Sequence, residues 1–320
     1  MTRTTMRSAA VLLTIALALA GCGDDNSVEL SDTASNGSTS TTSSIPEPAF
    51  PVTVTADNGD VSIAVKPTTI VSLSPSITEM LYAVGASDQV AAVDASSNFP
   101  ADAPVTDLSG FRPNVEAIGA LAPDLVFLAR DRDDVVATLE DVGLTVVLLE
   151  APESLVEVYD QIETVAAATG HADAGAQVAG DVESGINALL ADVTERGEPL
   201  TYFYELTSDY NTLTSDTFVG SLLSLAGLEN IADGVAPGAG SYPQLTAEYV
   251  LDTNPDVVFI AHADGSVPTD DELAARAGWA ELTAVVEGHI VALDPDIASR
   301  WGPRIVELLD AVLEATAGIG

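Results

Sequence analysis

Residues 172–196 read ADAGAQVAGDVESGINALLADVTER, and the rest of the chain is organised around this stretch. Val178, Val182, Ile186 and Leu189 recur every three or four residues, which is the spacing that places side chains on one face of an α-helix. Because a helix rises about 1.5 Å per residue, a helix of this length runs past the end of one small domain. The pattern therefore predicts a helix over 172–196 that joins two domains.

Two matching segments lie on either side of this predicted helix. Residues 115–129 read VEAIGALAPDLVFLA, and residues 247–261 read AEYVLDTNPDVVFIA. At an offset of 132 residues Glu116 aligns with Glu248, and in both segments a Pro-Asp pair precedes a short apolar run. The repeated helix and strand predict two lobes of similar architecture, with a ligand site in the cleft between them.

Short apolar runs alternate with helix-like segments throughout both halves, which is typical of parallel α/β sheets. The predicted fold class is therefore α/β, with two similar Rossmann-like lobes that have mostly parallel sheets and are joined by a long bridging α-helix. We place the N-terminal lobe at 50–170, the bridging helix at 171–198 and the C-terminal lobe at 199–320. Strands are expected at 70–73, 90–93, 125–129, 145–149, 200–206, 257–261 and 290–293, after an Asn58-Gly59 hairpin at 52–65.

The N-terminus has the pattern of an exported lipoprotein. Residues 1–21 combine two arginines with a short apolar run, and the motif Leu-Ala-Gly before Cys22 predicts a signal peptide whose cleavage leaves Cys22 as the lipidated first residue. Residues 22–49 are rich in Ser, Thr, Asp and Gly, so they predict a disordered tether. We therefore expect an exported protein that is lipid-anchored to the outer face of the cell membrane, or is periplasmic.

The composition excludes some classes of partner. The formal net charge is −39, from 49 acidic and 10 basic residues, and Lys66 is the only lysine. Because nucleic-acid binding needs a basic surface, we exclude it. The acidity fits solubility, or a saline medium that screens the repulsion between like charges.

The short motifs of hydrolases, phosphate-binding loops and zinc enzymes are absent from the sequence. The three histidines are dispersed, so we expect no metal site and no cofactor. Glu116 and Glu248 could act as an acid and base pair, but equivalent positions in separate lobes lie too far apart for that role. Each could also be a carboxylate that a helix N-terminus favours.

Several passages together resemble the iron-chelate and vitamin B12 periplasmic-binding family over about residues 50–316. They are IVSLSPSITEMLYAVGASDQVAAV, NVEAIGALAPDLVF, LAGLENI, NPDVVFIA and GHIVALDPDIASRWGPRIVELLDAVL. Members of this family are substrate-binding proteins of ABC importers, with two lobes joined by a long helix. The resemblance implies that Glu116 and Glu248 dock onto arginines of the permease.

Strand ends and the resemblance together select the residues of the cleft. In open parallel sheets ligands bind at the carboxyl ends of the strands, which here precede Ser74, Asp94, Arg130, Thr207 and His262. Relatives that take anionic ferric siderophores use arginines and tyrosines, whereas cobalamin-binding relatives use aromatic walls, and Ser97-Asn98-Phe99-Pro100 resembles that second subgroup. The predicted ligand-binding residues are Ser74, Phe99, Arg112, Arg130, Tyr204, Tyr242, His262, Arg300 and Trp301.

The resemblance implies a monomeric binding protein without catalytic activity that delivers a metal chelate to an ABC permease. A ferric siderophore is the favoured ligand, and cobalamin or haem is the alternative. A hypothesis from another class is an exported two-domain α/β enzyme, for which Asp94 and Glu205 are the acidic candidates.

Overall fold

The computed structural model describes residues 50–193, 197–235, 240–262 and 265–319. The predicted signal peptide, Cys22 and the tether lie outside these residues. The described residues belong to one compact unit, Pro46–Gly320. Within the described part of the chain, no helix is both long enough and apolar enough to cross a membrane.

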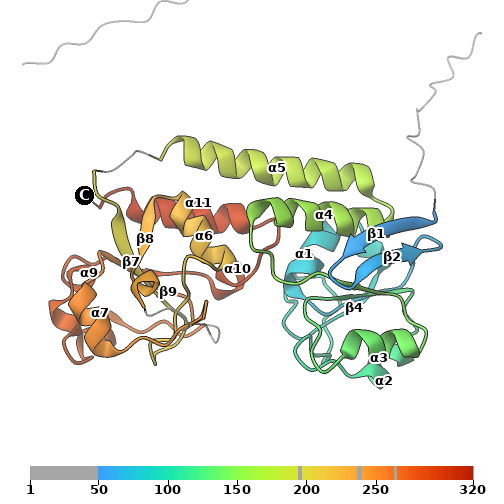
Figure 1. Cartoon of the computed structure of the whole chain (residues 1–320), viewed down its shortest axis with the longest axis horizontal. Helices are drawn as coiled ribbons and strands as arrows, with labels where there is room; N and C mark the ends of the chain where they lie inside the picture. Colours follow the sequence, from blue (N-terminus) through green and yellow to red (C-terminus); the bar gives the residue numbers. More distant parts are fainter. Residues whose placement is uncertain (1–49, 194–196, 236–239, 263–264, 320) are drawn as a thin grey trace, which may run out of the picture. The chain divides into compact units, whose positions relative to one another are not determined.

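The N-lobe, residues 50–170, is built on a parallel sheet in the order β4-β3-β5-β6, preceded by the antiparallel hairpin of β1 and β2 (Figure 1). Ser74 begins helix α1 because its hydroxyl accepts a hydrogen bond from the backbone of Ile77, and proline occupies the first helical turn. The strands are β1 (Val52–Ala56), β2 (Gly59–Ile63), β3 (Ile70–Ser72), β4 (Val90–Val93), β5 (Leu125–Leu128) and β6 (Val146–Leu148). The helices are α1 (Pro75–Ala83), α2 (Val115–Ala120), α3 (Val135–Asp141) and α4 (Leu155–Thr169), with a 3-10 turn at Ser87–Gln89.

The C-lobe, residues 197–319, contains a second parallel sheet in the order β10-β9-β7-β8. Its strands are β7 (Leu200–Glu205), β8 (Leu228–Asn230), β9 (Val257–Ile260) and β10 (Ile290–Ala292). Its helices are α6 (Phe218–Leu225), α7 (Ala247–Thr253), α8 (Asp270–Ala274), α9 (Thr283–Val286), α10 (Pro295–Ala298) and α11 (Ile305–Thr316), with 3-10 turns at Ile231–Gly234 and Trp279–Glu281. The two parallel sheets confirm the predicted α/β class.

The sequence repeat has a counterpart in the register of the sheets. Ile70 pairs with Leu125 in the N-lobe, and the residues 132 positions later, Tyr202 and Val257, pair in the C-lobe. The Pro-Asp pair explains part of this repeat, because the carboxylate of its aspartate accepts hydrogen bonds from a threonine backbone and hydroxyl at the start of the neighbouring strand in both lobes. These contacts fix how each lobe pairs its two central strands.

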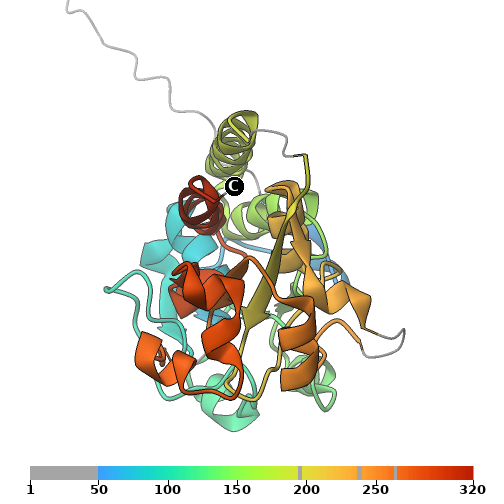
Figure 2. The ribbon, with the colours of Figure 1, turned by 90° about the vertical axis from the view of Figure 1, so that its left-hand side faces the viewer.

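Helix α5 (Ala172–Ala191) packs against elements of both lobes (Figures 1 and 2). Near its start Gly175 lies so close to α4 that an added Cβ would be 2.3 Å from the Cβ of Ala166. Further along, an added Cβ at Gly185 would be 3.1 Å from Val306 of α11. Small residues thus let one helix contact the N-lobe and then the last helix of the C-lobe.

The structure corrects some predicted boundaries. Helix α5 ends at Ala191 and not at 196, because an acidic Asp192 at a helix C-terminus opposes the helix dipole and Val193 has a low helix propensity. Residues 270–286 form α8, a 3-10 turn and α9 and not one continuous helix, with Gly278 at a positive φ of 82° between α8 and α9. Strand β8 was not predicted because its sequence, LEN, contains no apolar run, and helix α10 was not predicted because it has only four residues.

Candidate functional site

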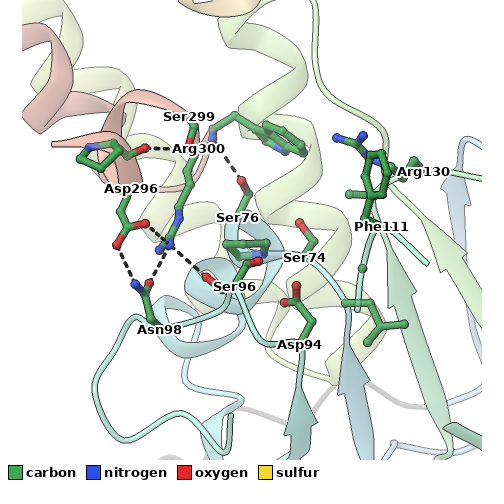
Figure 3. Close-up of a pocket in the computed structure, with 16 residues that line it drawn as sticks. Ser74, Ser76, Asp94, Ser96, Asn98, Phe111, Arg130, Asp296, Ser299 and Arg300 are labelled. Atoms are coloured by element: carbon green, nitrogen blue, oxygen red, sulfur yellow. Dashed lines mark hydrogen bonds and ion pairs between the residues drawn. The ribbon is translucent and has the colours of Figure 1, made fainter. Parts of the chain in front are cut away.

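A pocket of about 440 Å³ opens at the carboxyl ends of β3, β4 and β5 of the N-lobe. The C-lobe contributes only the segment around α10 to its lining. Figure 3 shows Arg300 on one side, Arg130 with Phe111 on the other, and Ser74, Ser76 and Asp94 between them. The lining residues are Leu73, Ser74, Pro75, Ser76, Asp94, Ser96, Asn98, Gly110, Phe111, Ala129, Arg130, Pro295, Asp296, Ser299, Arg300 and Trp301.

The floor of the pocket is polar and internally hydrogen-bonded. Asp94 is 3% exposed, and its carboxylate accepts a hydrogen bond from the hydroxyl of Ser97. Thr78 joins Ser97 to Ser72, with oxygen–oxygen distances of 3.0 and 2.9 Å. A buried network of this kind holds its members in one arrangement, because breaking any bond leaves a polar group unpaired.

Gly110 allows the backbone of the loop between β4 and α2 to approach β3. A Cβ added there would lie 2.2 Å from the carbonyl oxygen of Leu73 and 3.3 Å from the Asp94 carboxylate. No other residue fits without moving the pocket floor. The glycine therefore brings the neighbouring Phe111 to the pocket.

The wall on the C-lobe side consists of an ionic cluster that crosses between the lobes. Glu79 of α1 is 4% exposed and accepts hydrogen bonds from Arg300 at 2.9 Å and from Arg304 at 2.5 and 3.0 Å. The hydrogen bonds to Glu79 raise the pKa of the Arg304 guanidinium above its usual value. Arg300 also donates to Asn98 at 2.6 Å and to Asp296 at 2.7 Å.

Trp301 completes this wall. Its backbone N–H donates to the hydroxyl of Ser76 at 3.2 Å, and its indole N–H donates to Gln161 of α4 at 3.0 Å. The residues around α10 are therefore bonded to the N-lobe at several points, so the C-lobe side of the pocket is anchored to the opposite lobe.

The wall on the N-lobe side combines an aromatic ring with two cations. Arg130 lies with its Cζ 5.5 Å from the centroid of the Phe111 ring, and the Cζ of Arg132 lies 4.1 Å from the same centroid. All three side chains are exposed. Such contacts between a cation and a ring hold exposed arginines near one position.

The equivalent strand ends of the C-lobe are closed by an internal ion-pair cluster. Glu205 at the end of β7 is fully buried and receives two hydrogen bonds from Arg276, at 2.5 and 2.9 Å. The ring of His262 contacts the same carboxylate through Nε2 at 2.8 Å and the hydroxyl of Ser266 through Nδ1 at 2.9 Å. Arg276 also covers the ring of Trp279 at 4.3 Å.

The structure brings some of the predicted cleft residues together and places others elsewhere. Ser74, Arg130, Arg300 and Trp301 line the pocket. Five of the predicted residues do not line the pocket: Phe99, Arg112, Tyr204, Tyr242 and His262.

Packing explains where three of these residues lie. Tyr204 is fully buried, with its hydroxyl 3.4 Å from the carbonyl of Ala298, and this burial raises its pKa far above the usual range. The ring of Phe99 lies under Arg304 at 4.0 Å. His262 belongs to the buried cluster of Glu205.

Arg112 and Tyr242 are exposed and lie near the pocket mouth. Arg112 directly follows the lining residue Phe111. Tyr242 comes from the C-lobe, and its pKa is raised by partial burial while the positive charge of Arg130 acts in the opposite direction. Their contact with a ligand stays a prediction.

Sequence reasoning did not assign several polar lining residues to the site. Ser96 and Asn98 come from the loop after β4 that was expected at the cleft, and Ser76 lies in the first turn of α1, directly after Ser74. Attention to every polar residue that follows these strand ends could have found them. Asp296 and Ser299 belong to the short α10 and its C-terminal end, which left no periodic signal.

The predicted docking glutamates occupy equivalent positions on two helices. Glu116 lies in the first turn of α2, capped by Asn114, and Glu248 lies in the first turn of α7, capped by Thr246. Both side chains are exposed. In Figures 1 and 2, α2 and α7 lie on the side of the molecule away from α5.

The described residues contain no group of three or more His, Cys, Asp or Glu side chains that could hold a metal ion. The pocket offers a ligand hydroxyl, amide, carboxylate, guanidinium and aromatic groups.

Comparisons with known proteins give a consistent result. The family model "Periplasmic binding protein" matches residues 70–297. The uncharacterised ABC transporter substrate-binding lipoprotein YvrC of Bacillus subtilis is 32% identical, over 96% of this chain and 95% of that protein. A cobalamin-binding protein of Halobacterium salinarum is 31% identical, over 81% of this chain and 72% of its own. The crystal structure of the periplasmic vitamin B12 binding protein of Vibrio cholerae superposes with a TM-score of 0.65 at 28% identity, covering 79% of this chain and 97% of that one.

Proposed function

We propose, from the premise that this chain belongs to the periplasmic binding protein family, that it captures a corrinoid such as cobalamin in the pocket between its lobes. The chain is a substrate-binding protein of an ABC importer and not an enzyme. The choice of a corrinoid departs from the ferric siderophore that the sequence favoured. Two kinds of observation support the change.

The first kind comes from the relatives. Proteins named for cobalamin or vitamin B12 are 31% and 30% identical to this chain over 269 and 252 residues. The two alignments cover 81% and 76% of this chain. These relatives favour a corrinoid over other metal chelates. The second kind of observation is the match between the groups of the pocket and those of a corrinoid.

The observation that carries the proposal is the floor of the pocket. It presents the Asp94 carboxylate among the hydroxyls of Ser74, Ser76 and Ser96. A cyanide-bound cobalt(III) corrin ring has a cationic centre and a rim of amide side chains, so it matches a carboxylate surrounded by hydrogen-bonding groups. A siderophore that is anionic throughout would place negative charge against Asp94.

The net charge of the protein favours the same ligand. At −39, the protein repels an anionic chelate at long range, whereas a corrinoid without net charge meets no such barrier. Phe111 and Trp301 add apolar surface on opposite walls. A complete corrinoid is larger than the cavity of about 440 Å³, so its edge extends to the pocket mouth.

Titration calorimetry of the purified mature protein tests this proposal. Cyanocobalamin, a ferric hydroxamate, a ferric catecholate and haem would be titrated separately at equal ionic strength. We expect one-to-one binding of cyanocobalamin that is at least tenfold tighter than binding of any other probe. Binding of a ferric siderophore or haem with no binding of cyanocobalamin would overturn the proposal.

A ferric siderophore is the second candidate, and one observation favours it. Arg112 and Arg130 put positive charge at the pocket mouth, as an anionic chelate requires. The calorimetric comparison separates the two candidates because all probes meet the same pocket.

Docking on the permease is proposed through Glu116 and Glu248. Both are exposed on helices at equivalent positions of the two lobes, so they can orient the protein at two points. We expect the double variant Glu116→Gln and Glu248→Gln to keep its ligand affinity and to lose transport in vesicles with the cognate permease. Normal transport, or loss of ligand binding, would contradict this role.

Attachment to the membrane is proposed through a lipid on Cys22. The support is the Leu-Ala-Gly-Cys motif together with the lipoprotein relative from Bacillus subtilis. Replacement of Cys22 by Ser is expected to move the protein from the membrane fraction to the soluble fraction. Retention of the variant in the membrane fraction would exclude the anchor.

A further inference from the structure

The described arginines fall into two groups. Arg276, Arg300 and Arg304 make ion pairs with buried glutamates. By contrast, Arg112, Arg130 and Arg132 are exposed, and none of them makes an ion pair with a carboxylate of the described residues.

Two of these cations share one aromatic ring. The Cζ atoms of Arg130 and Arg132 are 5.5 and 4.1 Å from the centroid of Phe111, so they lie no more than about 10 Å apart. This upper bound is close to the Debye length, which is about 8 to 10 Å at 0.1 to 0.15 M salt, so the repulsion between the two charges is screened only in part. An anionic group placed between them relieves that repulsion and gains charge-assisted hydrogen bonds.

The position of this pair limits which anion fits. Arg130 and Phe111 line the pocket at its exposed edge, whereas the Asp94 carboxylate lies on the floor. A ligand that fits both the floor and the exposed edge needs a part without negative charge against Asp94 and one anionic group at its periphery near Arg130. A corrinoid with its nucleotide loop has this form, because the loop carries a single phosphodiester and a guanidinium matches phosphate oxygens in geometry and charge.

We propose that Arg130 and Arg132, held on the Phe111 ring, form a subsite for the phosphodiester of the ligand's nucleotide loop. The protein then distinguishes complete corrinoids from truncated ones that lack this loop. This inference rests on the proposed function and specifies the recognition at that same pocket. Arg130 is the main contact because it lines the pocket, and Arg132, which contacts the same ring, adds a second positive charge.

The test measures two ligands against three variants. Cyanocobalamin carries the phosphodiester, and aquacyanocobinamide keeps the corrin ring and its amides without the nucleotide loop. Each is titrated calorimetrically into the wild-type mature protein and into Arg130→Gln, Arg132→Gln and Lys66→Gln. Lys66 is absent from the pocket lining, so its variant controls for the loss of one positive charge.

Arg130→Gln is expected to bind cyanocobalamin about tenfold more weakly, as the loss of one charge-assisted hydrogen bond implies. Its affinity for aquacyanocobinamide is expected to stay within about twofold of the wild type, since that ligand has no group for Arg130. Arg132→Gln should show the same pattern with a smaller loss, and Lys66→Gln should change neither affinity.

Salt gives a second readout that does not depend on a variant. Raising the ionic strength should weaken the binding of cyanocobalamin to the wild type, because its peripheral anion is bound at an exposed site. The same change should have less effect on the binding of cyanocobalamin to Arg130→Gln, which lacks one of the two cations.

The outcomes separate this inference from the function on which it rests. If Arg130→Gln weakens both corrinoids equally, or weakens neither, the phosphodiester subsite is wrong while corrinoid capture stands. If neither corrinoid binds to the wild type, the proposed function itself is wrong. Loss of affinity in Lys66→Gln as large as in Arg130→Gln would also overturn the subsite, because general attraction would then explain the effect.

Discussion

The N-lobe and the C-lobe share the register of their central strands and differ in the side chains at the ends of those strands. After β5 of the N-lobe, Arg130 is exposed against Phe111 at the mouth of the pocket. At the position 132 residues later, His262 comes after β9 of the C-lobe and is buried against Glu205. The end of β5 is therefore available to a ligand, whereas the end of β9 is occupied by the ion-pair cluster of Glu205.

The two lobes of the repeat thus share their backbone arrangement, and they do not share the side chains that form a ligand pocket. The pocket takes its floor and one wall from the N-lobe, while the C-lobe supplies only residues 295–301. Glu205 and Arg276 neutralise each other inside the C-lobe, whereas Arg130 and Arg132 have no described ion-pair partner. We infer that recognition is asymmetric and that the C-lobe cluster serves stability.

Glu205→Gln is expected to give the largest effect. The change leaves Arg276 and His262 without their shared carboxylate in a buried site, and removing one partner of a buried ion pair costs about 3 kcal/mol. Urea denaturation followed by circular dichroism measures the loss in the free energy of unfolding. The control is Glu229→Gln, since Glu229 is exposed in the same lobe and should change stability by less than about 0.5 kcal/mol.

An equal effect of Glu205→Gln and Glu229→Gln would show that the buried ion-pair cluster does not stabilise the C-lobe. Weaker corrinoid binding by Glu205→Gln, measured where the variant is folded, would instead make the C-lobe cluster part of the recognition site.

Glu79→Gln is expected to have the next largest effect, about 2 kcal/mol. Glu79 differs from Glu205 because its arginine partners come from the other lobe, and Arg300 keeps its contact with Asp296 after the change. The variant should therefore also loosen the contact between the lobes. Hydrogen exchange of α1 and α10 measures this loosening, and unchanged protection of both helices would show that the ionic cluster does not couple them.

The ends of the repeated helices offer a smaller comparison. Ala122 after α2 and Asn254 after α7 occupy equivalent positions with left-handed φ values of 47° and 45°. Alanine is strained in this conformation, whereas asparagine tolerates it and here bonds to Thr283. We expect Ala122→Asn to raise the unfolding free energy by about 0.5 kcal/mol and Asn254→Ala to lower it by about 1 kcal/mol.

Chemical denaturation of Ala122→Asn and Asn254→Ala measures both changes in the free energy of unfolding. If Ala122→Asn destabilises the protein, the two helix ends differ in a way that their shared φ values do not describe.

Asp124 gives the smallest expected effect, which depends on pH. Hydrogen bonds from the backbone and hydroxyl of Thr68 hold the pKa of its carboxyl below the usual value. A lowered pKa in the folded state adds stability above the ordinary carboxyl range of about 4, and this stability is lost as the pH falls through the lowered pKa. The advantage of the wild type over Asp124→Asn should therefore be present at pH 7 and shrink below about pH 4. A difference that stays constant across this pH range would show that the charge of Asp124 has no part in it.

The sequence predicted the architecture well because periodic patterns report local structure. The alternation of strands and helices depends on residues that are close in the chain, and the repeat between Glu116 and Glu248 is visible when the two segments are aligned. The ionic cluster of Glu79, Arg300 and Arg304 could not be predicted, since the glutamate is more than 200 residues from the arginines and meets them only in the folded protein.

The orientation of Tyr204 was also not predictable. Strand β7 is buried at nearly every position, on both faces of the sheet, so its sequence has no alternation that tells which side chains face the core. Tyr204 was expected at the cleft and is fully buried in the C-lobe. The loops after β3 and β5, by contrast, were correctly expected near a pocket because ligands bind at the carboxyl ends of parallel strands.

The central claim is that the pocket at the strand ends of the N-lobe holds a corrinoid, and cobalt itself can report its position. Crystals of the mature protein grown with cyanocobalamin, measured on both sides of the cobalt absorption edge, locate the metal by anomalous scattering. We predict one cobalt peak in the space bounded by Ser74, Phe111 and Trp301. A cobalt peak beside His262 and Glu205, or no cobalt peak in crystals grown with saturating ligand, would contradict the account.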